Sequence, residues 1–163
     1  MRAADAQRYA AIESTDRPMS DIEELRRNAE AGSIVDQTVM GISYLWGYDV
    51  EQDYGEAFKW LTLASSQGVP RAIVNLGAMY ERGLGTAINI DAACALYEQG
   101  ARAGEFFGKV YLARSFANGI RGAVDEASAL KWYRRAAEMR NEVMDCVELQ
   151  EAEAYVASHS PAA

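Results

Sequence analysis

Apolar and small residues recur along the chain at helical spacing, in pairs of segments separated by glycine-rich turns. In one such pair, Ala72, Leu76 and Tyr80 fall four residues apart, which is the spacing of one helix face. A second periodic segment runs from about Asn89 to Gly104, and Gly83 lies between the two. This pattern predicts a helix, a turn and a second helix.

The predicted helix pair occurs three times at a constant period of 36 residues. Residues 33–68, 69–104 and 105–140 align without a gap. The shared columns, read from the first unit to the third, are Met40, Leu76 and Leu112; Gly41, Gly77 and Ala113; Tyr44, Tyr80 and Phe116; Gly47, Gly83 and Gly119; Asp53, Asn89 and Asp125; Ala57, Ala93 and Ala129; and Trp60, Leu96 and Trp132.

Each column suits one role in a helix pair. The column that begins with Gly47 falls just past the first helix, where a left-handed residue is favoured. The column that begins with Asp53 carries side chains that cap a helix, and Asp53 with Glu56 is typical of a capping-box variant. Small residues at Gly41 and Ala57 allow two helices to approach closely, so we expect the large Trp60 column to fill the core.

The order Leu-Gly-x-x-Tyr-x-x-Gly, then Asp, then Ala-x-x-Trp, resembles the Sel1-like repeat, a relative of the tetratricopeptide repeat. The resemblance covers residues 33–140 and implies an all-α, right-handed α-solenoid of helix-turn-helix units. The chain departs from the family's pattern at four positions: Asp36 and Gly108 replace Ala, and Ala113 and Arg140 replace Gly.

The flanking segments are predicted to extend and cap this array. Residues 1–20 are predicted to form a lead helix, over residues 3–13, and a loop, and residues 21–32 the second helix of a degenerate repeat. Residues 141–157 predict a capping helix with Val143, Cys146, Val147 and Ala154 on one side. Residues 158–163 are predicted to be a frayed tail.

Composition and charge narrow the class of protein. Half of the 163 residues are apolar and a quarter are charged, which is typical of a globular protein. The net charge of −8 disfavours binding to nucleic acid or anionic lipid. No run of about 18 apolar residues predicts a membrane span. The first residues mix charges into every turn, which predicts no signal peptide and therefore a cytoplasmic location, or a secreted or periplasmic one only if a signal peptide was removed.

The charge is unevenly distributed between the units. Residues 105–140 carry seven basic and four acidic residues, and residues 141–163 carry five acidic residues and no lysine or arginine. Two explanations remain open: the basic third unit meets an acidic segment of a partner, or it balances the adjacent acidic helix.

The residues that could carry catalysis or hold a metal are sparse. Two cysteines and one histidine are too few for a structural zinc site, and Cys94 is predicted to be a buried, inert thiol. Ser128 and Lys131 match the S-x-x-K motif of penicillin-recognising enzymes, but the other elements of that site are missing. We therefore predict no catalytic residues, no metal and no cofactor.

In arrays of the family that the chain resembles, the first helices line the concave face. Helical spacing then places one stripe of side chains there, and we name it the first-helix stripe. Its members are Val35, Val39, Ile42 and Trp46 in the first unit; Arg71, Asn75, Ala78 and Arg82 in the second; and Phe107, Tyr111, Arg114 and Asn118 in the third. An alternative is that the lead helix folds back and covers the stripe of the first unit.

These features favour a non-enzymatic protein–protein interaction module, an adaptor or scaffold that binds a protein or peptide on its concave face. The resemblance implies signalling, assembly or secretion-linked adaptors, and the small domain suggests a bacterial one, acting as a monomer or weak dimer. One alternative is an inhibitor or immunity-type protein that neutralises a single enzyme or toxin. A remote alternative is a penicillin-binding or β-lactamase-like activity, which has been linked to cysteine-rich relatives of the repeat.

Overall fold

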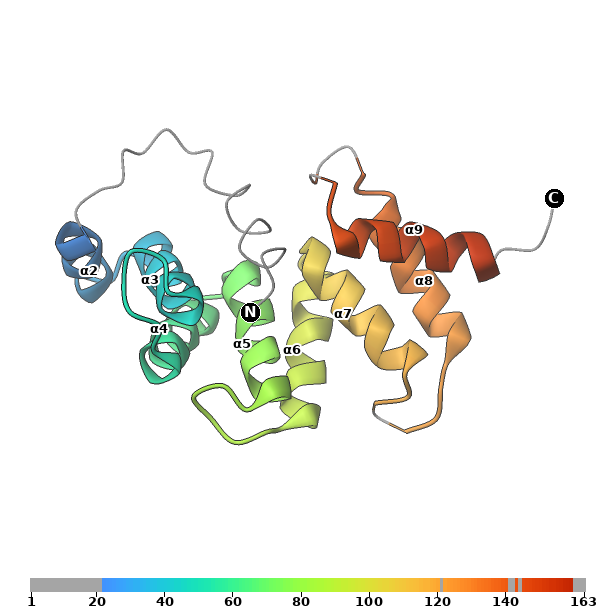
Figure 1. Ribbon diagram of the computed structural model, residues 1–163, viewed down its shortest axis with the longest axis horizontal. Helices are drawn as coiled ribbons and strands as arrows, with labels where there is room; N and C mark the ends of the chain where they lie inside the picture. Colours follow the sequence, from blue (N-terminus) through green and yellow to red (C-terminus); the bar gives the residue numbers. More distant parts are fainter. Residues whose placement is uncertain (1–21, 121, 141–142, 144, 160–163) are drawn as a thin grey trace.

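The computed structural model describes residues 22–120, 122–140, 143 and 145–159, and within these ranges the chain forms eight helices and no strand (Figure 1). None of these helices is long and apolar enough to cross a bilayer. The helices are α2 (Ile22–Glu30), α3 (Ile34–Trp46), α4 (Tyr54–Ser66), α5 (Pro70–Arg82), α6 (Ile90–Arg102), α7 (Phe106–Ala117), α8 (Glu126–Ala137) and α9 (Val147–His159).

The helices stack in chain order, so each packs mainly on its neighbours in the sequence (Figure 1). Three pairs, α3 with α4, α5 with α6 and α7 with α8, correspond to the three predicted units. Each pair contacts the next through its second helix, as α4 contacts α5 and α6 contacts α7. The predicted α-solenoid of helix-turn-helix units is confirmed.

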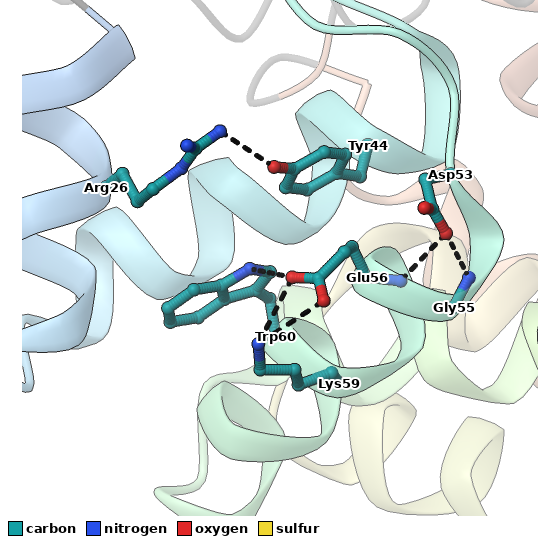
Figure 2. Close-up of polar contacts among 7 residues, drawn as sticks. All are labelled: Arg26, Tyr44, Asp53, Gly55, Glu56, Lys59 and Trp60. Carbon is teal, nitrogen blue, oxygen red and sulfur yellow. Dashed lines mark hydrogen bonds and ion pairs between the residues drawn. The ribbon is translucent and has the colours of Figure 1, made fainter.

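Polar caps and glycines set the ends of these helices, as the repeat columns predict. The Asp53, Asn89 and Asp125 side chains accept hydrogen bonds from backbone amides in the first turns of α4, α6 and α8. Gly47 and Gly83 follow α3 and α5 in the left-handed region, with φ of 73° and 68°. The capping box is only half formed, because Glu56 binds Lys59 and Trp60 instead of reaching back to Asp53 (Figure 2).

Small residues bring the two helices of a unit into close contact. A Cβ atom on Gly41 would lie 2.6 Å from Cγ of Leu61, so α3 and α4 approach at a distance that only glycine allows. Gly77 meets the ring of Tyr97 in the same way in the second unit. Since a methyl group does not fit at either position without displacing its neighbour, these two glycines are packing residues.

The large aromatic column is less uniform than the sequence predicts. Trp60 is 5% exposed and packs with Leu25, Ala29 and Met40 between α2, α3 and α4. Leu96 and Trp132, at the same position of the later units, are only half-buried. The prediction that this column fills the core is therefore confirmed for the first unit alone.

The C-terminal helix differs from its prediction in both bounds and facing. It begins at Val147 instead of residue 141 and continues to His159, so residues 158 and 159 are helical and not part of a frayed tail. The prediction also chose the wrong face, because Val147 and Ala154 are exposed, and Leu149 and Ala152 are buried in their place. The predicted lead helix at residues 3–13 lies outside the described residues.

α9 takes the place of the first helix of a further pair. It packs on α8 as α7 packs on α6, and it also touches α7 as α5 touches α3. Val143 and Cys146, ahead of α9, pack against the same apolar cluster as Leu149 and Ala152. The solenoid thus continues through α9 with its own geometry, although the 36-residue columns do not.

Candidate partner-binding surface

The first-helix stripe in its first unit is apolar, and part of it lies in solvent. Val35 is 66% exposed and Val39 is 39% exposed, one helical turn apart on α3. Ile34 beside them is 39% exposed, and Trp46 at the end of α3 is half-buried. The prediction that Ile42 lines the stripe is wrong, because this residue is only 9% exposed and packs in the core with Leu45 and Leu61.

Of the stripe residues in the second unit, only Arg82 is exposed. Asn75 is buried, and its side-chain amide donates a hydrogen bond to the Arg71 carbonyl at 2.9 Å, so it does not line an open surface as predicted. Arg71 and Ala78 are half-buried. The Arg71 charge also acts on Glu105 at the start of α7, where it opposes the burial that raises the pKa of that carboxyl.

In the third unit aromatic side chains pack against one another along α7. Phe107 and Tyr111 are half-buried, with ring centroids 6.1 Å apart, and Tyr111 lies 5.1 Å from the ring of Tyr97 on α6. Tyr97 is buried, and its hydroxyl donates to Glu81 at 2.8 Å. Burial and the Glu81 charge together raise the pKa of Tyr97. Asn118, the last stripe residue, is exposed.

Arg114, which the sequence places on the stripe, is used to hold α9. Its guanidinium forms a two-point ion pair with Glu151 of α9, with Nε 3.2 Å from Oε1 and Nη2 close to Oε2, and it also lies over the Tyr111 ring. The Tyr133 hydroxyl donates to the same carboxylate at 2.5 Å. The hydrogen bonds to Glu151 raise the pKa of Arg114. Arg114 is therefore a structural residue of the C-terminal end before it is a candidate for partner contact.

A second surface, which the sequence did not predict, lies beside α2. An open pocket of about 530 Å³ is bounded by α2, α3 and the loop between α3 and α4, and we name it the α2–α3 pocket. Its lining residues are Arg26, Tyr44, Val50, Glu51, Gln52 and Asp53. Figure 2 shows Arg26 on α2 directed at the hydroxyl of Tyr44 on α3, and the two groups are 3.0 Å apart.

The loop of the α2–α3 pocket is held by backbone contacts. The amide of Asp53 donates to the Tyr44 carbonyl at 3.0 Å, and the Gln52 side chain donates to the Leu45 carbonyl at 2.8 Å. One carboxylate oxygen of Asp53, Oδ1, accepts the amides of Gly55 and Glu56 (Figure 2). The pocket is thus a formed feature of the first unit.

The described residues offer little for catalysis or metal binding. No three His, Cys, Asp or Glu side chains among them come together as a metal-binding group. Cys94 is buried, as predicted, and neither Cys94 nor Cys146 forms a disulfide. Burial raises the pKa of Cys146, which disfavours its reactive thiolate form. The backbone amide of Ser128 donates a hydrogen bond to Oδ1 of Asp125, the N-cap of α8, so the S-x-x-K residues are ordinary positions of that helix.

Comparison with known proteins identifies the repeat. The Sel1 repeat family model matches residues 37–69, 70–105 and 109–141, and the chain belongs to this family. A crystal structure of a Sel1 repeat protein from Oxalobacter formigenes is similar, with 33% sequence identity and a TM-score of 0.68 over 85% of this chain and 98% of the other.

Two curated relatives are similar over part of their length. The chitin synthase regulator SKT5 of Saccharomyces cerevisiae is 40% identical over 60 residues, which is 36% of this chain and 9% of that protein. The mouse DAP3-binding cell death enhancer 1 is 34% identical over 80 residues, 49% of this chain and 15% of that protein. Sel1 repeats generally mediate protein–protein interactions and typically serve as non-catalytic scaffolds.

Proposed function

We propose that this chain is a non-enzymatic adaptor or scaffold module that binds a protein or peptide segment along its first-helix stripe. The observation that carries the proposal is the exposure of Val35 and Val39, 66% and 39%, one turn apart on α3. Adjacent exposed apolar side chains on a rigid helix are typical of a protein contact site. Trp46, half-buried at the end of the same helix, supplies an aromatic anchor.

Other properties of the chain are consistent with this role. Cys94 and Cys146 form no disulfide, which suits the reducing cytoplasm that we propose as the location, in a bacterial cell. The net charge of −8 favours solubility and a monomer or weak dimer that is free to bind another protein. The names of the curated relatives, a chitin synthase regulator and a DAP3-binding protein, also describe proteins that act through other proteins.

The test is affinity purification from the source organism with the wild type and a Val35→Glu, Val39→Glu variant. We expect the variant to recover at least about tenfold less partner than the wild type, because two carboxylates would be desolvated in the contact. Its free energy of unfolding should change by no more than about 0.5 kcal/mol per substitution, since both side chains are exposed.

The matched control is Leu63→Glu with Ile88→Glu, which changes two apolar residues that are 42% and 66% exposed and lie off the stripe. Equal recovery of the partner by wild type and stripe variant would reject the stripe as the binding site. Recovery of one very tight partner that inhibits an enzyme or toxin would favour the inhibitor class over the adaptor class.

A further inference from the structure

The α2–α3 pocket is separate from the first-helix stripe, because none of its lining residues belongs to that stripe. Its volume of about 530 Å³ is within the usual range of ligand sites, roughly 300 to 1,000 Å³. Its lining is mostly polar, with Val50 as the aliphatic member. Polar side chains of both charges around one opening indicate a ligand that carries charge itself.

One set of lining groups can donate hydrogen bonds. The Arg26 guanidinium gives one Nη2 proton to the Tyr44 oxygen, and its Nη1 lies 3.7 Å from Glu23. A guanidinium has five N–H donors, so several remain after these contacts. The Tyr44 hydroxyl accepts from Arg26 and keeps its own proton as a donor. These two residues are suited to bind a carboxylate.

Another set of lining groups can accept hydrogen bonds. Glu51 is exposed in the α3–α4 loop, and Asp53 uses Oδ1 for the backbone amides of α4, which leaves Oδ2. Over the described ranges of the chain, no lysine or arginine forms an ion pair with either carboxylate. These two residues are suited to bind an ammonium or guanidinium group.

The charges at this position are peculiar to the junction between α2 and the first unit. Thirty-six residues further on, at the junction of the first and second units, Thr62 stands in the column of Arg26 and Ala87 in the column of Glu51. At the junction of the second and third units, these columns hold Glu98 and Ala123. At the junction of the first and second units, the ring of Phe58 on α4 packs edge-on against Tyr80 on α5, with centroids 5.4 Å apart. The charged lining is therefore not a property that the repeat imposes on every unit.

We propose that the α2–α3 pocket binds a partner's peptide segment in which a basic and an acidic side chain are close neighbours. The basic group is held by Glu51 and Asp53, and the acidic group by Arg26 and the Tyr44 hydroxyl. A purely acidic segment would meet the repulsion of Glu51, and a purely basic one that of Arg26. This inference goes beyond the proposed function, because it assigns a second contact with its own charge specificity.

The test is a titration of the ¹⁵N-labelled full chain with short peptides, followed by amide chemical shifts. A set of Gly-Ser peptides carries one Lys and one Glu, spaced by zero, one or two residues. Matched sets carry Lys alone or Glu alone. We expect the best mixed-charge peptide to bind at least about fivefold more tightly than either single-charge peptide, with shifts concentrated at residues 44–53.

Three variants assign the binding to the pocket. Glu51→Gln and Arg26→Gln each remove one charge, and Tyr44→Phe removes the hydroxyl while keeping the ring. Each should weaken binding of the mixed-charge peptide by about threefold or more. Glu138→Gln, which makes the same charge change as Glu51→Gln but just after α8, should not weaken it. Thermal unfolding of each variant shows whether the fold is intact.

Several results would overturn the proposal. If the Lys-only peptide bound as tightly as the mixed-charge peptide, general attraction by acidic residues would explain the binding. If the Glu-only peptide bound as tightly, Arg26 alone would explain it. Shifts scattered over the surface, or unchanged binding by Glu51→Gln, would also reject it. The stripe variant Val35→Glu, Val39→Glu should bind these peptides as the wild type does, so failure here and failure of the proposed function are distinguishable.

Discussion

The two ends of the described solenoid use similar arginines for different purposes. Arg26 on α2 and Arg114 on α7 each contact a tyrosine, Tyr44 in one case and Tyr111 in the other. Arg114 also has Glu151, because α9 brings that carboxylate against α7, whereas Arg26 borders an open pocket. Whether an arginine is available to a partner therefore depends on what the next helix in the stack places beside it.

The same comparison explains the uneven charge of the chain. Arg114 pairs with Glu151, and Arg140 pairs with Glu153 at 2.6 Å, so two cations of the basic third unit are neutralised by the acidic α9. For these two arginines, the explanation that the basic unit balances the adjacent acidic helix is correct. Recognition of an acidic partner is not needed to explain their presence. These two arginines are therefore less available to an acidic partner.

The largest expected difference between the ends concerns two tryptophans of one column. Trp60→Ala should lower the free energy of unfolding by about 3 to 5 kcal/mol, because the ring is buried between three helices. Trp132→Ala should cost roughly half as much, since that ring is half-buried and partly covered by Arg135, 4.9 Å from its centroid.

Urea unfolding of both variants, followed by circular dichroism, measures this difference. Equal losses of stability would mean that the deeper burial of Trp60 does not make it more stabilising than Trp132. A loss below about 1 kcal/mol for Trp60→Ala would show that the column is not part of the core.

An intermediate effect is expected from the ion pair that holds α9. In a double-mutant cycle, Arg114→Ala and Glu151→Ala should show a coupling of about 1 to 2 kcal/mol, between the values for exposed and buried pairs. The matched cycle of Arg140→Ala and Glu153→Ala should give less than about 1 kcal/mol, because the Arg140 side chain is 66% exposed. Equal couplings would contradict the role assigned to Arg114.

The smallest effect is pH-dependent and concerns the Asp125 cap of α8. Hydrogen bonds from Ser128 lower the pKa of Asp125 below its ordinary value of 3.8. A lowered folded pKa means that ionised Asp125 stabilises the fold above pH 3.8, and that this stability is lost as the pH falls through the folded pKa.

Thermal unfolding from pH 7 to pH 2 tests this sign. Asp125→Ala should unfold at a lower temperature than the wild type at neutral pH, and the gap should close at acidic pH. Asn89→Ala removes the uncharged cap at the equivalent position of α6 and should give a gap that stays constant. A gap that widens as the pH falls would contradict the assignment.

Much of the fold could be predicted, because the repeat gives each position three independent observations. The cap column of Asp53, Asn89 and Asp125 fixed the starts of three helices within a residue. The glycine column at Gly47 and Gly83 located the ends of α3 and α5. α9 lacked these columns, and a helical pattern alone misplaced its start by six residues.

The surface was harder to predict than the fold. Helical spacing placed Val35 and Val39 correctly in solvent, but it could not show that the body of the solenoid covers Ile42 and Asn75. The α2–α3 pocket joins Arg26 to a loop about 25 residues away, and neither Arg26 nor Glu51 belongs to a shared column. The sequence did carry a signal for this pocket, because Arg26 and Glu51 are charged, whereas the equivalent positions further along the chain are neutral or oppositely charged.

α9 stands in the position of a first helix, and α2 contacts α3 as a second helix would. Within the described residues, whole units therefore lie between two flanking helices that differ from them. Duplicating or deleting residues 69–104, which form one whole unit, would lengthen or shorten the molecule by one step and leave α2 on α3 and α9 on α8. In evolution or in protein engineering, the reach of such a module could change by one duplication while the chemistry at its two ends is inherited unchanged.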